Sequence, residues 1–171
     1  MAGVHFKYSD FRQLIKLNIG IAGRLDENRA ESLTLLYCDF SKFDKEEIKN
    51  SLESILRNSD SIVNHKKDYY FVLPYTDKYG ADIVKTMFEE HFNKKISNFL
   101  VSYPVDGEDS SELIEFLQSS VKKFCKNDIS YLDELSEKWY QLKIVFKICS
   151  QHQVEYCELM KTPFLNQDLV K

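Results

Sequence analysis

The sequence lacks the features that mark nucleic-acid-binding, secreted and membrane proteins. It has no run of more than two basic residues, and 23 Lys and Arg against 27 Asp and Glu give a net charge of -4 at pH 7. A polyanion is therefore an unfavourable partner. No stretch approaches the roughly 18 apolar residues of a membrane span, and Lys16 and Asn18 interrupt the apolar residues near the N-terminus. We expect a cytoplasmic protein that binds neither nucleic acid nor membranes.

The four cysteines include no Cys-x-x-Cys pair. Cys38 lies in an apolar run, where a free thiol behaves as a small hydrophobic side chain, and this favours a reducing compartment. Cys149, His152 and Cys157 are an alternative set of metal ligands. All three lie on one predicted helix, however, whereas a zinc site usually takes its ligands from two segments. We therefore expect no metal and no other cofactor.

The spacing of apolar residues predicts both helices and strands along the chain. Hydrophobic residues make up 43% of the 171 residues and aromatic residues 13%, which is enough to fill the core of one domain. The expected helices are 11–22, 44–57, 77–92, 110–125 and 134–160, and the expected strands are 33–39, 61–65, 69–73 and 96–103.

This order of elements predicts an α/β (α+β) fold with a palm-like βαββαβ core. Such a core has a sheet that contains antiparallel strands, with its helices on one face. We expect an N-terminal helix and loop in residues 1–31, the core in residues 32–127, and an added C-terminal helical extension in residues 128–171. The helix predicted over 134–160 carries Trp139 and Phe146 on its apolar stripe, which must be buried either against a protein partner or a second copy, or against the helix's own domain.

Three segments of the core carry a recognisable pattern. Arg57-Asn-Ser-Asp60 is followed after five residues by Lys66-Lys67-Asp68-Tyr69-Tyr70 and an apolar run that ends in Pro. The run Tyr-Cys-Asp39 precedes them, and Tyr-Pro-Val-Asp-Gly107 follows them. In order and spacing these segments resemble a GGDEF domain, the diguanylate cyclase fold of bacterial signalling proteins, over residues 33–125.

The sequence departs from this family's pattern at the residues that carry catalysis. Lys66 and Lys67 stand where the family has Gly-Gly, which lets the backbone approach the nucleotide. Asp68 keeps the acidic residue that follows, but Tyr69 and Tyr70 replace the Glu-Phe pair. Phosphoryl chemistry with two metal ions needs dense carboxylate ligation. The resemblance therefore implies a degenerate, catalytically inactive domain that acts as a regulatory or protein-interaction module.

Two pairs of residues leave alternatives open. Asp39 and Asp68 are either the remnant of a metal pair or two solvated carboxylates at strand ends, and we favour the second interpretation. Arg57 and Asp60 match the family's inhibitory-type site for cyclic di-GMP, or they form a local pair at the surface. A cyclic di-GMP receptor is thus the second hypothesis, and an active diguanylate cyclase is the least favoured.

The family's cyclic di-GMP site also draws on an arginine of the helix after the hairpin. That arginine falls at about Met87 in this sequence, so the resemblance is incomplete there. Lys85, close by on the same helix, is a substitute as a point charge, although it lacks the bidentate geometry of arginine.

Overall fold

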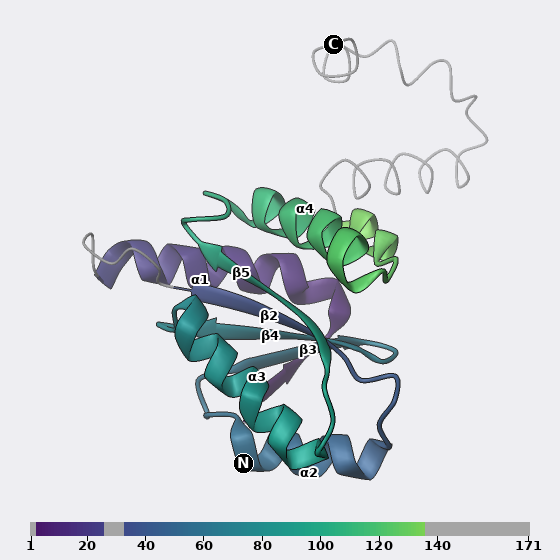
Figure 1. The fold of residues 1–171 in the computed structure, drawn as a ribbon. Coiled ribbons are helices and arrows are strands. Elements are labelled where there is room, and N and C mark those ends of the chain that lie inside the picture. Colours follow the sequence, from purple (N-terminus) through teal and green to yellow (C-terminus); the bar gives the residue numbers. More distant parts are fainter. Residues whose placement is uncertain (1–2, 26–32, 136–171) are drawn as a thin grey trace, which may run out of the picture. The chain divides into compact units, whose positions relative to one another are not determined.

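Five strands form one mixed sheet in the computed structural model, which describes residues 3–25 and 33–135 (Figure 1). The strands are β1 (Val4–Phe6), β2 (Leu33–Asp39), β3 (Ser61–His65), β4 (Asp68–Pro74) and β5 (Ser97–Tyr103). Their order across the sheet is β1-β3-β4-β2-β5. Strand β1 is parallel to β3, and all other neighbours are antiparallel. The two residues between β3 and β4 make a tight hairpin.

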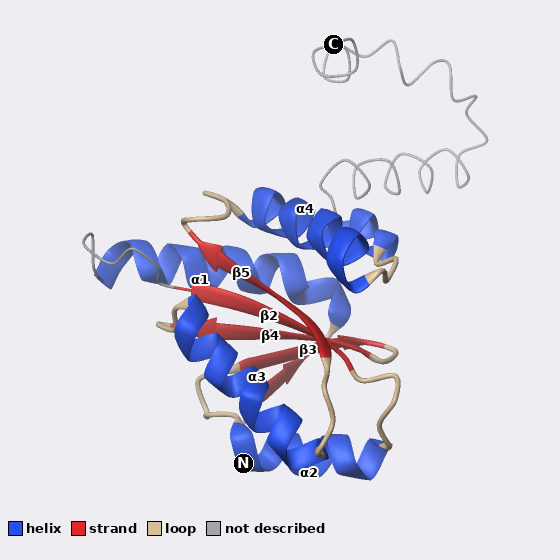
Figure 2. Cartoon of the chain, in the orientation of Figure 1, coloured by secondary structure: helices blue, strands red, loops and turns tan. Residues whose placement is uncertain are grey.

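Within the described residues, four α-helices connect or follow the strands (Figure 2). They are α1 (Phe11–Leu25), α2 (Lys45–Ile55), α3 (Lys78–Phe92) and α4 (Ser110–Ser120), with shorter helical segments at Tyr8–Asp10, Val121–Cys125 and Ser130–Leu135. An aspartate begins three of the four: the side chains of Asp44, Asp77 and Asp109 accept hydrogen bonds from backbone N–H groups of the first turn. None of the described helices is long and apolar enough to cross a membrane.

The helices cover both faces of the sheet. Helices α2 and α3 lie on one face and helices α1 and α4 on the other (Figure 1). Side chains alternate along each strand, so β4 directs Phe71 to the first face and Tyr70 to the second. The first face is an apolar cluster that includes Phe40, Phe71 and Phe88, all fully buried. On the second face, the ring of Phe11 from α1 packs 5.0 Å from that of Tyr70.

This architecture confirms the expected α/β fold with a βαββαβ core and an N-terminal helix. Helices α2 and α3 share one face as expected, whereas α1 and α4 cover the face for which no helices were predicted. Strand β1 was missed because three residues are too short for a periodic signal. The predicted C-terminal helix over 134–160, apart from its first two residues, lies outside the described residues, and the proposed domain limits stay predictions.

Candidate functional site

The hairpin turn between β3 and β4 is the position where the sequence pattern has two lysines. Lys66 has a φ of 57°, in the left-handed region that favours glycine. The Nζ of Lys67 donates to the carbonyl of Phe43 at 3.0 Å, and the carbonyl of Lys67 accepts from the backbone N–H of Phe40 at 2.9 Å. The turn is therefore tied to the segment between β2 and α2.

The two aspartates predicted as neighbours are direct partners in the sheet register. Asp39 at the end of β2 is paired with Asp68 at the start of β4. The carboxylate of Asp39 accepts a hydrogen bond from the backbone N–H of Ser41 at 2.8 Å, which closes a local turn. The sheet thus brings the two residues together, which only the metal-pair interpretation requires.

The carboxylate of Asp68 is the centre of a network of side chains. Its Oδ1 accepts hydrogen bonds from the Tyr37 hydroxyl at 2.7 Å and from Nδ2 of Asn127 at 2.9 Å, and its Oδ2 accepts one from the Tyr131 hydroxyl at 2.7 Å. Asn127 also donates to the Tyr37 hydroxyl at 2.6 Å. Asp68 is thus a half-buried carboxylate with three side-chain donors, which neither of the two interpretations of the sequence included.

Tyrosine rings enclose this network. The hydroxyls of Tyr70 and Tyr131 lie 2.5 Å apart, and the Tyr8 hydroxyl donates to the Tyr131 carbonyl at 2.8 Å. Burial raises the pKa of Tyr37, Tyr70 and Tyr131 well above the ordinary value, and Asp68 adds to the rise in each case. These hydroxyls therefore stay protonated at physiological pH, and those of Tyr37 and Tyr131 donate to the carboxylate.

Sequence reasoning missed Asn127 and Tyr131 as partners of Asp68. Both follow α4 in a largely polar segment, and Tyr131 is 63 residues after the aspartate in the chain. A weak signal was present, because Ile129 and Leu132 of the same segment are apolar, three positions apart and fully buried. That spacing indicates that the segment packs against the domain, but it does not identify the carboxylate that the segment reaches.

The residue after Asp68 points to the opposite face of the sheet. The half-buried ring of Tyr69 packs 4.9 Å from that of Phe40 on the α2 and α3 face. Tyr70 is fully buried on the α1 and α4 face. Burial raises the pKa of Tyr69 as well. Among the described residues no group of three or more His, Cys, Asp or Glu side chains could hold a metal ion. Cys149, His152 and Cys157 lie outside the described residues.

The Arg57 and Asp60 pair lies at the other end of β3, away from the hairpin. The Asp60 carboxylate is buried and accepts a hydrogen bond from the backbone N–H of Arg57 at 2.8 Å. Burial raises its pKa, although the Arg57 N–H and the Arg57 charge act in the opposite direction. The Arg57 side chain itself is exposed. The carboxylate of Asp60 therefore helps to close the turn between α2 and β3.

The helix after the hairpin carries the two positions that bear on the cyclic di-GMP hypothesis. Met87 is partly exposed on α3. The ammonium group of Lys85 lies 2.8 Å from the Asp82 carboxylate and 4.0 Å from that of Glu89. Lys85 is thus held in ion pairs on its own helix, so its charge is already matched.

Comparison with known proteins identifies the fold. No family model matches the sequence, and no curated protein matches it. Among solved structures, the GGDEF domain of PA1120 (TpbB or YfiN) from Pseudomonas aeruginosa is similar, with a TM-score of 0.54 and 14% sequence identity. The match covers 70% of this chain and 84% of that one. The resemblance seen in the sequence is therefore confirmed at the level of the backbone, and the chain has a GGDEF-like fold.

Proposed function

We propose that this chain is a catalytically inactive GGDEF-like domain that acts as a regulatory or protein-interaction module. The observation that carries the proposal is the set of three side-chain donors on Asp68, from Tyr37, Asn127 and Tyr131. A carboxylate that ligates a metal must direct its lone pairs at the ion. The lone pairs of Asp68 are instead directed at protein donors, so metal binding would require this network to open.

The neighbouring residues support the same proposal. Tyr69 stands at the position of the second carboxylate of the family's pattern, and its ring packs on Phe40. A tyrosine with a raised pKa is neutral and a poor substitute for a carboxylate beside a magnesium triphosphate. The lysine turn, with Lys67 bonded to Phe43, differs from the open glycine turn that lets a backbone approach phosphate groups.

A cyclase assay tests the proposal. The purified chain, incubated with GTP and Mg²⁺ or Mn²⁺, is expected to yield no cyclic dinucleotide by mass spectrometry. A GGDEF domain with the complete family motif serves as the positive control. Turnover by this chain that is lost in Asp39→Ala would contradict the proposal, since Asp39 is the remaining carboxylate beside Asp68 in the register.

Cyclic di-GMP binding at Arg57 and Asp60 is the second candidate function. The exposed side chain of Arg57 favours it, because an arginine fork can grip a guanine edge or a phosphate. The position of the pair also favours this function. Arg57 and Asp60 precede β3 at the end opposite to the hairpin, so the changes at the hairpin do not affect them directly. A ligand would either bind without disturbing the hydrogen bond between the Arg57 N–H and the Asp60 carboxylate, or replace that hydrogen bond with one of its own.

Titration calorimetry with cyclic di-GMP decides the second candidate. Binding by the wild type that is lost in Arg57→Ala would support it, because removal of this exposed side chain leaves the turn intact. Asp60→Asn is the milder test at the second position, since an amide oxygen can still accept the Arg57 N–H. The absence of heat with the wild type, or equal heat with wild type and Arg57→Ala, would remove the site.

A further inference from the structure

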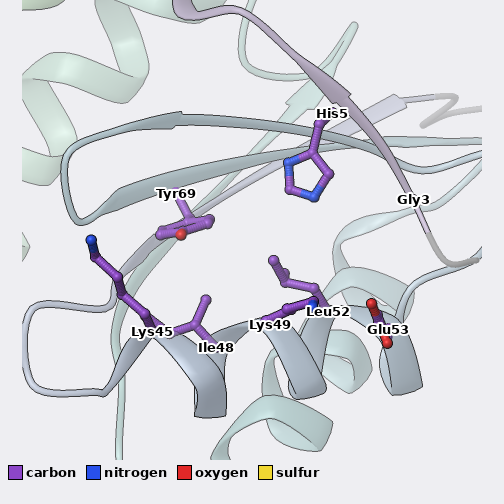
Figure 3. A pocket seen from close by; sticks show the side chains of 8 residues that line it. All are labelled: Gly3, His5, Lys45, Ile48, Lys49, Leu52, Glu53 and Tyr69. Atoms are coloured by element: carbon purple, nitrogen blue, oxygen red, sulfur yellow. The ribbon is translucent and has the colours of Figure 1, made fainter.

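A pocket of about 450 Å³ lies between α2 and the sheet (Figure 3). One wall is a stripe of α2, and the opposite wall consists of Tyr69 from β4 with Gly3 and His5 from the N-terminal strand segment. Gly3 immediately precedes β1, and His5 lies in it. The pocket therefore depends on the N-terminal strand and is separate from the Asp68 network on the other face.

The α2 wall combines an apolar floor with a cationic rim. Lys45, Ile48, Lys49 and Leu52 follow helical spacing, so their side chains share one face of α2. Ile48 and Leu52 are buried, whereas both lysines are exposed at the rim. Lys45 is the first residue of α2, where the positive end of the helix dipole disfavours a cation. The Asp44 side chain already caps this end of the helix, so the cationic rim is made by the two lysines.

The opposite wall offers two rings. Tyr69 lines the pocket with a half-buried ring, and His5 points into it from the strand above (Figure 3). The hydroxyls of Tyr37, Tyr70 and Tyr131 all have partners in the Asp68 network, but that of Tyr69 has no side-chain or backbone partner within the described residues. An aromatic surface with an unused hydroxyl suits a flat ligand.

The strand that carries His5 is fixed by the backbone. Gly3 has a φ of 69°, and a Cβ at this position would lie 2.7 Å from Cδ1 of Ile62. Its N–H donates to the Arg57 carbonyl at 2.9 Å, and the N–H of Val4 donates to the Asp60 carbonyl at 2.8 Å. These contacts fix the backbone of the strand that carries His5, so this wall of the pocket is built into the fold.

Glu53 sets the orientation of an anionic ligand. It lies at the Gly3 end of the pocket, whereas Lys45 and Tyr69 are at the other end (Figure 3). A ligand with negative charge at both ends would be repelled by the Glu53 carboxylate. The charged groups therefore favour a compound with one anionic group beside Lys45 and Lys49 and an uncharged ring between Tyr69 and the apolar floor.

From this arrangement we propose that the pocket binds a small aromatic phosphate monoester. A phosphate monoester carries nearly two negative charges at pH 7, which matches two lysines one helical turn apart. Its ring would pack on Tyr69 and over Ile48 and Leu52. The pocket shares Tyr69 with the β3 to β4 hairpin, but none of its residues belongs to the Asp68 network.

Nuclear magnetic resonance titration of the full chain with phenyl phosphate tests the proposal. We expect saturable shifts at His5, Lys49 and Tyr69, and a Kd roughly fivefold lower than that of inorganic phosphate because the ring adds an aromatic contact. Benzoate, which has the ring but a single charge, is expected to bind more weakly than phenyl phosphate. Equal Kd values for phosphate and phenyl phosphate, or no saturable shift with phenyl phosphate, would overturn the proposal.

Paired variants locate the site. Lys45→Gln with Lys49→Gln is expected to raise the Kd of phenyl phosphate roughly tenfold through loss of charge-assisted contacts. The matched control, Lys16→Gln with Lys122→Gln, removes two exposed lysines outside the pocket and leaves the Kd unchanged. Circular dichroism confirms that both proteins are folded. An equal change of Kd in both pairs would show that only net charge matters and would reject the pocket.

Discussion

Strand β4 sends alternate side chains into two different environments. On the α2 and α3 face, Phe71 packs 5.2 Å from Phe88, within a cluster that is aromatic and aliphatic. On the α1 and α4 face, Tyr70 and Asp68 join hydroxyl and amide groups that satisfy one another. A carboxylate that loses water costs free energy unless it gains partners. The polar face supplies those partners, whereas the apolar face offers none.

The donors on the α1 and α4 face explain how Asp68, the acidic residue kept from the family's pattern, can be half-buried in a packed domain. Asp68 is held by residues from β2 and from the segment after α4, so its carboxylate connects parts of the chain that lie far apart in sequence. Asp39, its partner in the register, has a local bond to Ser41. The two aspartates are neighbours in space but differ in how much of the fold depends on them.

The largest expected change in stability follows from a loss of packing on the apolar α2 and α3 face. Phe88→Ala removes a fully buried ring that contacts Phe40 and Phe71, and it should lower the free energy of unfolding by about 3 to 5 kcal/mol. Chemical denaturation measures the loss. Phe116→Ala, at a ring that is 40% exposed on α4, is the control and should cost much less. Equal losses of stability in the two variants would show that the α2 and α3 face is not packed more tightly than the exposed part of α4.

The next largest change in stability follows from a loss of hydrogen bonds on the polar α1 and α4 face. Asp68→Ala leaves the Tyr37 and Tyr131 hydroxyls and the Asn127 amide without their acceptor, and it should cost about 2 to 3 kcal/mol in the free energy of unfolding. Asp39→Ala is the matched control, because it removes the paired carboxylate with its single local bond, and should cost less than about 1 kcal/mol. The same loss in both variants would contradict a special role for Asp68.

A smaller effect concerns the helix that covers the polar face. Asp109 begins α4, and the backbone N–H of Glu112 and then that of Ser111 lower the pKa of its carboxyl. Asp109→Ala should cost about 1 kcal/mol at neutral pH. Because the pKa is lower in the folded state, the carboxylate stabilises the fold above its unfolded pKa of about 3.9, and this is lost as pH falls through the folded pKa.

Denaturation of wild type and Asp109→Ala between pH 3 and 7 measures this effect. The difference in stability between the two proteins should be largest near pH 7 and should shrink towards pH 3. Asp82→Ala, which removes an exposed carboxylate inside α3, does not change a helix cap and serves as a reference. A difference between wild type and Asp109→Ala that does not vary with pH would contradict the assigned cause.

The smallest expected change in stability concerns the turn that precedes β4. Lys66→Gly relieves a left-handed φ of 57° and should raise the free energy of unfolding by about 0.5 to 1 kcal/mol. Lys67→Gly is the contrasting variant, because it removes the bond to the Phe43 carbonyl and should destabilise. We expect that neither variant, nor the two together, binds GTP. Loss of stability in Lys66→Gly would mean that its side chain has a contact of its own.

Much of the fold could be predicted because its signals are local. The apolar run that became β2 and the helical spacing that became α2 and α3 are short-range patterns, and the structure places these elements within a few residues of their predicted limits. The Arg57 to Asp60 turn also follows from local spacing. What spacing could not show is that the Asp60 carboxylate binds the Arg57 backbone and leaves the Arg57 side chain exposed.

The sequence by itself determined the order of the four α-helices and of strands β2 to β5, and the chemical types available at the hairpin, since periodicity and residue identity act over a few residues. Only the tertiary structure decided the use of those groups. Strand β1 forms because β3 offers it a free edge, and Asp68 has its partners because the segment of Tyr131 returns to the sheet. Hydrogen bonds between distant residues depend on packing of the whole chain, and no local pattern records them.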